Sequence, residues 1–467
     1  MLQFEEVAVL DRNSEYRGVP PERLMENAGK RLAEEIYEMH PDKDIIFICG
    51  TGNNGGDAYV AARYLGDWIG HDRITVFLIK GSDGVRSELA KDNLDKLDCK
   101  IIDEMDWDLV EDFVVVDALL GTGVQGEIRE PYRSVIQNMN HRSKNIISVD
   151  VPSGLGADIQ VTPELTITFH DLKEGMEEDG CGEIIVRDIG IPKKAEIFTG
   201  PGELLLYPKP IDTSHKGDNG SLLIIGGGPY TGAPALAALA AYRVGVDLVH
   251  LAVPVEIKNV VAGFSPGFIV HPLEGKKVIK EHVDKLLSLS EECDAVLLGP
   301  GLGDDEDTLE ACKDFIERVD KPIVIDADAL KSAAENPEIL SGETVITPHA
   351  GEIRMFDDKI EPVKLADKLA EKYSVTVLLK GKIDYITDGV MCKKNDFGTP
   401  AMTVGGTGDT LAGVVGGLLS KGMSSFDASR LGVFITSRAG ELAFQDFSWG
   451  LMPEDICKCI TEVLKDA

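Results

Sequence analysis

The sequence predicts an α/β protein of two domains, each built on an open parallel sheet with helices on both faces. Its 467 residues exceed what one hydrophobic core usually holds. Short β-branched runs alternate with amphipathic stretches in both halves, which is typical of three-layer α/β folds. A proline- and glycine-rich passage around 195–215 interrupts this alternation. We therefore place the domains at 1–210 and 211–467.

The first half begins with a predicted helix over 21–39, which Pro20 and Pro21 suit because proline is favoured in a first helical turn. Another helix is predicted over 58–65. Buried parallel strands are predicted at 44–49, 73–79, 113–117 and 145–150. Each strand ends in a polar or glycine-rich turn. Ligands of open parallel sheets bind at the carboxyl ends of the strands, so these turns are the candidate site.

The second half repeats the alternation. A strand over 221–226 precedes a helix of small residues over 235–241, and the last predicted helix covers 410–419. Further strands are predicted at 295–298, 322–325, 344–346 and 376–379. Their polar turns should converge on one edge of a second sheet.

The chain is strongly acidic, with 80 Asp and Glu against 47 Lys and Arg and a net charge of −33. A phosphate backbone or an anionic membrane surface would be repelled, which argues against nucleic acid or membrane partners. We find no apolar run of about 18 residues and no basic stretch followed by an apolar core. The eight cysteines lack zinc-ligand spacing. We therefore expect a reduced cytoplasmic protein.

Three turns of the first half carry oxygen ligands. The segment GTGNNGGD at 50–57 combines glycines, which allow close backbone approach to a phosphate, with two asparagines. Asp117 and Asp150 end two strands, and Ser153 follows closely. Carboxylate, amide and hydroxyl oxygens suit a hard cation such as K⁺. Either aspartate could instead be a helix cap. The GxGxxG fingerprint is absent, which disfavours a standard dehydrogenase.

With these motifs the first half, over roughly 1–210, resembles the epimerase domain of the NAD(P)H-hydrate repair family. LMENAG at 24–29, DALLGTGVQGE at 117–127 and DVPSG at 150–154 complete the likeness. It implies a Rossmann-like fold that interconverts R and S forms of NADH or NADPH hydrated at ring position 6. It implies K⁺ bound by Asn54, Asp117 and Ser153, and a catalytic Asp150 beside the reacting carbon. The other implied substrate contacts are Asn53, Asn54, Gly55, Gly56, Asp57, Gly121, Thr122, Gly123, Val124, Gln125, Gly126 and Glu127.

The most informative turn of the second half is GGTGD at 405–409, which opens the helix over 410–419. Its glycines let backbone N–H groups converge, and the helix start adds the positive end of a dipole. Asp409 beside such an anion site can take a proton from a hydroxyl that meets a phosphoryl group. The alternative is a tight loop with Asp409 as a solvated cap. Lys380, followed by Gly381, offers a cation for a nucleotide phosphate.

This half, over about 211–467, resembles the ribokinase-like dehydratase of the same repair pathway. The motifs are HKGD at 215–218, YTGAP at 230–234, GPGLG at 299–303, DADAL at 326–330, TPHAGE at 347–352 and GTGD at 406–409. The resemblance implies that ADP or ATP with Mg²⁺ drives water off the S-hydrate, releasing AMP or ADP and phosphate. It implies hydrate contacts from Ala233, Gly303, His349 and Asp409. The implied nucleotide contacts are Lys380, Gly381, Lys382, Ile383, Asp384 and Gly408.

Asp384 departs from the family, which usually has threonine there, and would place a negative charge near an anionic ligand. Two alternatives stay open. The second half could be a small-alcohol or vitamin kinase fused to a ligand-binding module, or the first half could be a binding module without chemistry. TPHAGE and the intact Asn54, Asp117, Asp150 and Ser153 disfavour them. The family also implies a homo-oligomer, a tetramer or larger.

Overall fold

The computed structural model describes residues 1–108, 110–124 and 126–467. It divides the chain into unit 1, Met1–Ala195, and unit 2, Glu196–Ala467. This division comes earlier than the boundary we place at residue 210. The intervening passage packs with unit 2, because Thr199 donates a hydrogen bond to Asn395 Oδ1 at 2.9 Å and the Tyr207 hydroxyl donates to Val244 O at 2.9 Å.

Unit 1 contains a seven-stranded sheet in the order β3-β2-β1-β4-β5-β6-β7, and every pair in it is parallel. The predicted strands correspond to β1, β2, β4 and β5, whereas β3, β6 and β7 were not predicted. The strands are Ile45–Cys49 (β1), Ile74–Leu78 (β2), Lys100–Ile102 (β3), Val114–Ala118 (β4), Ile146–Val149 (β5), Leu165–Phe169 (β6) and Glu183–Arg187 (β7).

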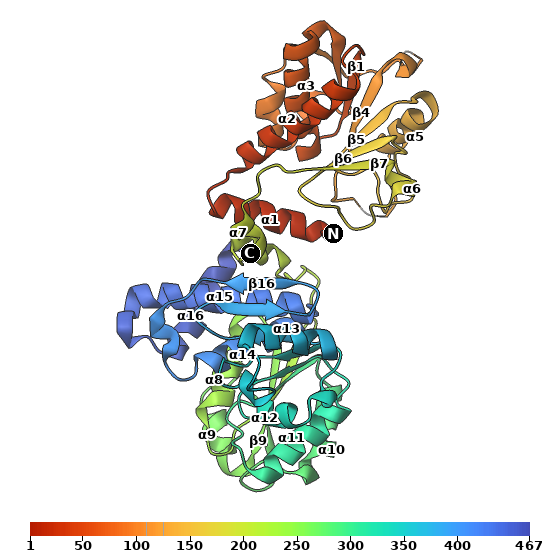
Figure 1. The fold of residues 1–467 in the computed structure, drawn as a ribbon. Coiled ribbons are helices and arrows are strands. Elements are labelled where there is room, and N and C mark those ends of the chain that lie inside the picture. Colours follow the sequence, from red (N-terminus) through yellow and green to blue (C-terminus); the bar gives the residue numbers. More distant parts are fainter. Residues whose placement is uncertain (109, 125) are drawn as a thin grey trace. The chain divides into compact units, whose positions relative to one another are not determined.

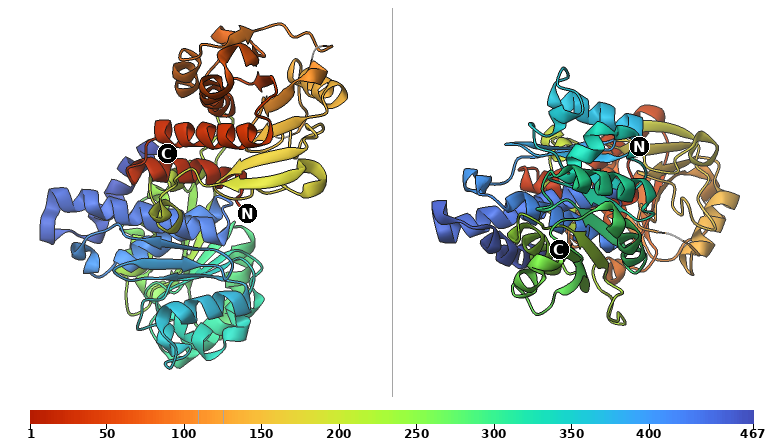
Figure 2. Two further views of the ribbon diagram at one scale, coloured as in Figure 1. Left: turned by 45° about the horizontal axis from the view of Figure 1, so that its top comes forward. Right: turned by 90° about the horizontal axis from the view of Figure 1, so that it is seen from below.

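Helices cover both faces of this sheet. Residues of α2, α3 and α4 form one hydrophobic core with the sheet, and α5 forms a second core on the other face. The first helix, α1, was not predicted; it packs against α2 (Figures 1 and 2). The helices are Phe4–Tyr16 (α1), Pro21–Met39 (α2), Asn53–Ile69 (α3), Glu88–Leu94 (α4), Tyr132–Arg142 (α5) and Glu178–Cys181 (α6). Helix Lys193–Ile197 (α7) includes the residues at which the chain is divided into units.

Unit 2 contains a nine-stranded sheet in the order β10-β9-β8-β11-β12-β13-β14-β15-β16. It is parallel as far as β14 and antiparallel at β15 and β16. The strands are Ser221–Ile225 (β8), Leu248–Pro254 (β9), Ile269–Leu273 (β10), Ala295–Leu298 (β11), Ile323–Ile325 (β12), Thr344–Ile346 (β13), Thr376–Leu379 (β14), Asp384–Thr387 (β15) and Cys392–Asn395 (β16).

The helices of unit 2 also form two layers (Figure 1). Residues of α8, α14, α15 and α16 share one core, and those of α10 to α13 share the other. The helices are Gly232–Arg243 (α8), Lys258–Ala262 (α9), Val283–Glu291 (α10), Glu306–Arg318 (α11), Ala329–Glu335 (α12), Pro362–Tyr373 (α13), Thr407–Ser420 (α14), Ser425–Phe447 (α15) and Pro453–Val463 (α16). The predicted α/β class is confirmed for both units.

The strand orders locate the crevice of each sheet. In unit 1 the order reverses between β1 and β4, and in unit 2 between β8 and β11. Ligands of such sheets bind at the carboxyl ends of the strands beside this reversal. The glycine-rich turns after β1, β8 and β11 lie at these positions. Within the described ranges, no helix has the length and apolar character needed to cross a membrane.

Candidate active sites

Unit 1 has a cavity of about 710 Å³ at the carboxyl ends of its central strands. Seven of the predicted contact residues line it: Asn53, Asn54, Asp57, Gly121, Thr122, Gly123 and Asp150. The described lining does not include Gly55, Gly56, Val124, Gly126 or Glu127. Gly55 and Gly56 are instead buried in α3, and Gln125 lies outside the described residues. The structure thus places part of the predicted set around one cavity.

The turn after β1 passes close to the segment after β4. Gly50 N donates to Ala118 O at 3.0 Å, and a Cβ atom at Gly50 would lie 1.9 Å from Leu119 O. A side chain cannot fit there. This contact fixes the turn that leads to Asn53 and Asn54 against the segment that leads to Gly121.

We expect Gly50→Ala to destabilise the protein by about 1–3 kcal/mol, because the methyl group overlaps a backbone oxygen and the turn must shift. Gly52→Ala is the matched control in the same turn, since a Cβ atom there has nothing within 4 Å. Urea unfolding of both variants checks this. A loss for Gly52→Ala as large as that for Gly50→Ala would contradict the close-approach argument.

Asp117, at the end of β4, is the centre of a buried polar cluster. Its side chain is 0% exposed and accepts hydrogen bonds from Ser148 Oγ at 2.8 Å, Ser153 N at 2.9 Å and Ser153 Oγ at 2.5 Å. Burial raises its pKa, although these bonds oppose the rise. Ser153 Oγ also accepts from Leu120 N at 2.8 Å, and Asn54 Nδ2 donates to Leu120 O at 3.2 Å. The three predicted cation ligands therefore surround the same backbone segment.

Asp150 lies on the cavity wall in a left-handed conformation, with φ at 62°. Its carboxylate forms an ion pair with Lys173, a residue of the loop after β6 that is 2% exposed. Lys173 also donates to Thr168 Oγ1 at 2.9 Å and Phe169 O at 2.7 Å. Sequence reasoning missed Lys173. The run 165–169 has the composition of a strand, and a lysine that closely follows such a strand could have been identified as a candidate site residue.

Two further carboxyl groups line the same cavity. Burial raises the pKa of Asp11 to about 6, with the negative charge of Asp150 adding to the rise and Lys173 opposing it. Burial also raises the pKa of Asp57 well above its ordinary value, and Asp150 and Asp11 add to this rise. Asp11 belongs to α1, the helix that was not predicted. The amphipathic run FEEVAVLDR at 4–12 could have indicated this helix in the sequence.

In unit 2 the predicted anion turn opens α14. Gly406 has φ at 100° and precedes the first helical residue, Thr407, whose hydroxyl donates to Met402 O at 2.9 Å. Asp409 stands in the first turn of α14 and lines a cavity of about 570 Å³. Burial raises the pKa of Asp409 to about 7; negative Asp326 and Asp328 contribute to the rise and positive Lys380 opposes it.

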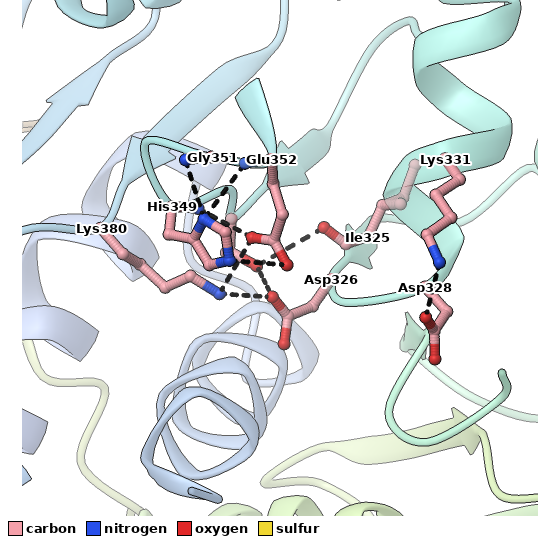
Figure 3. Close-up of polar contacts among 9 residues, drawn as sticks. Ile325, Asp326, Asp328, Lys331, His349, Gly351, Glu352 and Lys380 are labelled. Atoms are coloured by element: carbon pink, nitrogen blue, oxygen red, sulfur yellow. Dashed lines mark hydrogen bonds and ion pairs between the residues drawn. The ribbon is translucent and has the colours of Figure 1, made fainter. Parts of the chain in front are cut away.

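Lys380 reaches the same region from the end of β14 (Figure 3). Its Nζ lies 2.8 Å from Asp326 Oδ1 and 4.0 Å from Glu352 Oε2. Thr347 Oγ1 also donates to Asp326 Oδ1, at 2.6 Å. Burial would lower the pKa of Lys380, but the charges of Asp326 and Glu352 outweigh it and raise the pKa. Lys380 is thus a charged ammonium group that compensates a buried carboxylate.

His349 is held at the rim of the site. Its Nδ1 accepts hydrogen bonds from Gly351 N at 2.9 Å and Glu352 N at 3.1 Å, which leaves Nε2 as the donor nitrogen (Figure 3). Nε2 lies 3.5 Å from Glu352 Oε1. The side chain is 58% exposed and lines a second cavity of about 320 Å³. His349 can therefore donate a hydrogen bond to a ligand.

Asp328 lies near the two remaining predicted hydrate contacts, Gly303 and Ala233. It lines both cavities and accepts a hydrogen bond from Gly303 N at 2.9 Å. Ala233 lines the cavity that contains Asp409. The motifs DADAL and TPHAGE were recognised, but Asp326, Asp328 and Glu352 were not among the predicted site residues. Their shared feature is a carboxylate in a turn after a buried strand.

The predicted nucleotide contacts, residues 380–384 and Gly408, do not all lie around the ammonium group of Lys380. A Cβ atom at Gly408 would lie 3.6 Å from Lys380 Nζ, so these two residues are neighbours. Lys382 and Ile383 are exposed. Asp384 accepts hydrogen bonds from Gly381 N and from Asn395 Nδ2, both at 2.9 Å, and burial raises its pKa. Its carboxylate stabilises the turn itself, which accounts for an acidic residue at this position.

The chain is a two-domain α/β protein with glycine-rich turns at the reversal of each sheet. Residues 222–462 match the family model described as NAD(P)H-hydrate dehydratase, and 21–175 match that described as YjeF-related protein N-terminus. A bifunctional NAD(P)H-hydrate repair enzyme of Methanothermobacter thermautotrophicus is 42% identical, over 98% of this chain and 94% of its own. The chain belongs to the family of bifunctional NAD(P)H-hydrate repair enzymes.

Solved structures resemble unit 2 in fold. A ribokinase-like superfamily protein from Enterococcus faecalis aligns with a TM-score of 0.52 and 22% identity, covering 58% of this chain and 95% of that one. The ADP/ATP-dependent NAD(P)H-hydrate dehydratase of Bacillus subtilis, co-crystallised with ATP and Mg²⁺, aligns with a TM-score of 0.50 and 24% identity, covering 58% and 98%. The predicted ribokinase-like fold and the predicted family are confirmed.

Proposed function

We propose that unit 1 interconverts the R and S hydrates of NADH and NADPH, and that unit 2 dehydrates the S-hydrate with ADP or ATP. Phosphorylation of the ring hydroxyl followed by loss of phosphate would restore NAD(P)H and release AMP or ADP. The observation that carries the dehydratase is Asp409 at the glycine-opened start of α14, with Lys380 beside Gly408. Family membership over nearly the full chain supports the pairing of both activities.

In unit 2 each group has a separate role. Asp409 takes the proton of the hydroxyl, because its pKa of about 7 allows it to be ionised and still basic at neutral pH. The N–H groups at the start of α14 bind the transferring phosphoryl group. Lys380 adds a positive charge, and His349 donates a hydrogen bond to the hydrate. Mg²⁺ usually binds through few carboxylates and the substrate phosphates, so we expect it to enter with the nucleotide.

In unit 1 the cluster around Asp117 fits K⁺. Within the described ranges no lysine or arginine forms an ion pair with this buried carboxylate, and burial of an uncompensated charge is costly. A monovalent cation held by Asn54, Asp117 and Ser153 would compensate it. The ion would fix the segment 119–123 that forms the cavity wall. Asp150 faces the cavity as the candidate acid–base group for the reacting carbon.

One assay tests the proposed function. The protein, Mg²⁺ and ADP or ATP are mixed with pure R-hydrate or pure S-hydrate of NADH or NADPH, and the near-ultraviolet dihydronicotinamide absorbance is followed. Recovery of absorbance from both the R- and the S-hydrate supports both activities. Comparing ADP and ATP with the hydrates of NADH and NADPH determines which nucleotide and which cofactor the protein prefers. Recovery from the S-hydrate alone would overturn the epimerase. If unit 2 were a small-alcohol kinase, neither hydrate would give recovery of absorbance. The match of residues 222–462 to the dehydratase family model disfavours this alternative.

We further expect Lys380→Met to raise the nucleotide concentration needed for half-maximal dehydration more than the hydrate concentration. The variant should also shift the pH profile. Asp409 must be ionised to act as a base, so the rate rises as pH increases through its pKa. Lys380 lowers that pKa, and its removal raises the pKa, so the rise should move to higher pH. Rates of Lys380→Met and of the exposed control Lys359→Met between pH 6 and pH 9 check this. An unshifted profile would contradict the coupling.

Two broader expectations remain proposals. Eight free cysteines, five of them buried, support a reducing compartment such as the cytoplasm. Assembly into a homo-oligomer of four or more chains is proposed from the family, and light scattering of the purified protein tests it.

A further inference from the structure

The N-terminal helix brings an additional acidic group into the cavity of unit 1. Asp11 lies on α1 and lines the cavity that also contains Asp57, Asp150 and Lys173. Six other residues of the N-terminal segment line it as well: Leu2, Phe4, Glu5, Val7, Ala8 and Leu10. The segment is therefore part of the site and not a peripheral extension.

Backbone hydrogen bonds fix this segment to the loop that carries Lys173. Leu2 N donates to Leu172 O at 2.7 Å, and Glu174 N donates to Leu2 O at 2.8 Å. The loop and the start of α1 thus form one bonded unit. A ligand in the cavity meets Asp11 from the helix and Asp150 from the turn after β5.

Asp11 and Asp150 differ in their charge partners. Asp150 forms an ion pair with the buried ammonium of Lys173. Burial and the charge of Asp150 favour the neutral form of Asp11, whose pKa is about 6. The charged and titratable groups that face the cavity around Asp11 are Glu5, Asp57, Asp150, His170 and Lys173. A carboxyl group with a raised pKa and a carboxylate paired with a lysine thus line one cavity, an arrangement suited to acid–base chemistry.

We propose that Asp11 is a catalytic acid–base residue of this cavity and that it works as a pair with Asp150. The assignment rests on the proposed epimerase function. The neutral carboxyl group of Asp11 gives its proton to the ring hydroxyl at C6 of the hydrate. The C6–O bond breaks, and its electron pair leaves with the oxygen as water. The lone pair of the ring nitrogen forms the C6=N bond of a ring cation.

The second half of the reaction restores the balance. A water molecule adds to the opposite face of C6, the C6=N electron pair returns to nitrogen, and the proton lost by the water goes to the Asp150 carboxylate. The product is the other epimer, and no oxidant or reductant is consumed. Return of the proton from Asp150 to Asp11 restores the starting state, with the Asp150 carboxylate again paired with Lys173. In the reverse direction the two carboxyl groups exchange roles.

Asp57 is a poorer candidate for this proton. Its pKa is raised well above the ordinary range by burial and by both neighbouring carboxylates. Efficient acid–base catalysis needs a group whose pKa lies near the working pH, so that it both releases and regains the proton. Burial and the neighbouring carboxylates favour the neutral form of Asp57, which can donate a hydrogen bond to the ligand. Asp11, with a pKa of about 6, is closer to this condition.

The test measures epimerisation in the full chain without nucleotide, starting from pure R-hydrate and separating the epimers chromatographically. We expect Asp11→Asn to lower kcat by about 10²–10⁴-fold with KM changed only a few-fold. Asp11→Glu should regain part of this activity. Glu15→Gln, which makes the same carboxyl-to-amide change on an exposed residue of α1, should retain the wild-type rate.

A second readout does not depend on a variant. The wild-type rate, corrected for uncatalysed epimerisation, should fall as pH rises through about 6, because Asp11 must be protonated to donate. Asp11→Asn should lack this dependence. A kcat for Asp11→Asn within a few-fold of wild type, or a wild-type profile flat between pH 5 and pH 8, would overturn the assignment alone. A wild-type protein that does not accelerate epimerisation would overturn the proposed function of unit 1 and this assignment with it.

Discussion

Asp409→Asn should lower the rate of dehydration by about 10²–10⁴-fold, because asparagine keeps the size of the side chain but cannot accept a proton. The proposed phosphate site, formed by the start of α14 and Lys380, is unchanged in this variant, so nucleotide binding should survive. Wild-type dehydration should rise with pH through about 7 as Asp409 becomes ionised. The residual rate of Asp409→Asn should not follow this rise.

Both activities should be measured on the same preparation of Asp409→Asn. Epimerisation belongs to unit 1, a separate compact unit, and should continue at the wild-type rate. Asp320→Asn supplies the matched control, since Asp320 is an exposed carboxylate of unit 2 that lines neither of its cavities. Dehydration by Asp409→Asn within a few-fold of wild type would exclude Asp409 as the base. Loss of both activities would indicate a folding defect or coupling between the units.

The strands and turns that build the two sites could be predicted from sequence because their signals are local. An apolar run that ends in Asp117 or precedes Asp326 needs no distant partner to be recognised. The same holds for the glycine turn before Asp409, since a glycine with positive φ is needed there. Local patterns of this kind are enough to locate both sites at the carboxyl ends of the strands.

The missed features depend on contacts between distant segments. α1 is polar along much of its length, and its place in the site is set by Leu2 bonding to the loop 172–174. The sequence shows neither this contact nor the ion pair between Lys173 and Asp150. Asp384 could not be interpreted either, because its partner Asn395 lies on β16 and only the antiparallel pairing of β15 and β16 brings them together.

The two units differ in how they compensate the charge of a buried carboxylate. Each buries a carboxylate at the end of a central strand: Asp117 is 0% exposed and Asp326 is 2% exposed. Asp326 is neutralised by Lys380 of its own unit. Asp117 receives only hydrogen bonds from serine and backbone donors among the described residues. An external cation would compensate a buried carboxylate that has no positive partner among the described residues, which is why we propose K⁺ in unit 1 alone.

Asp117→Asn should therefore lower the affinity of the protein for K⁺ by at least about 10–100-fold and slow epimerisation accordingly, while dehydration of pure S-hydrate stays near normal. Asparagine can still accept hydrogen bonds from Ser148 and Ser153, whereas Asp117→Ala leaves these buried donors unpaired at a cost of about 1–3 kcal/mol. Both variants lose the charge, so both should lose the K⁺ effect.

Thermal unfolding gives a readout that is independent of activity. A ligand that binds only the folded state raises the unfolding temperature as its concentration increases. Replacement of Na⁺ by K⁺ at constant ionic strength should stabilise unit 1 of the wild type but not of Asp117→Asn. Epimerisation by the wild type should show the same preference for K⁺ over Na⁺. If Asp117→Asn is stabilised by K⁺ as the wild type is, or epimerises at the wild-type rate without K⁺, the cation does not bind at Asp117.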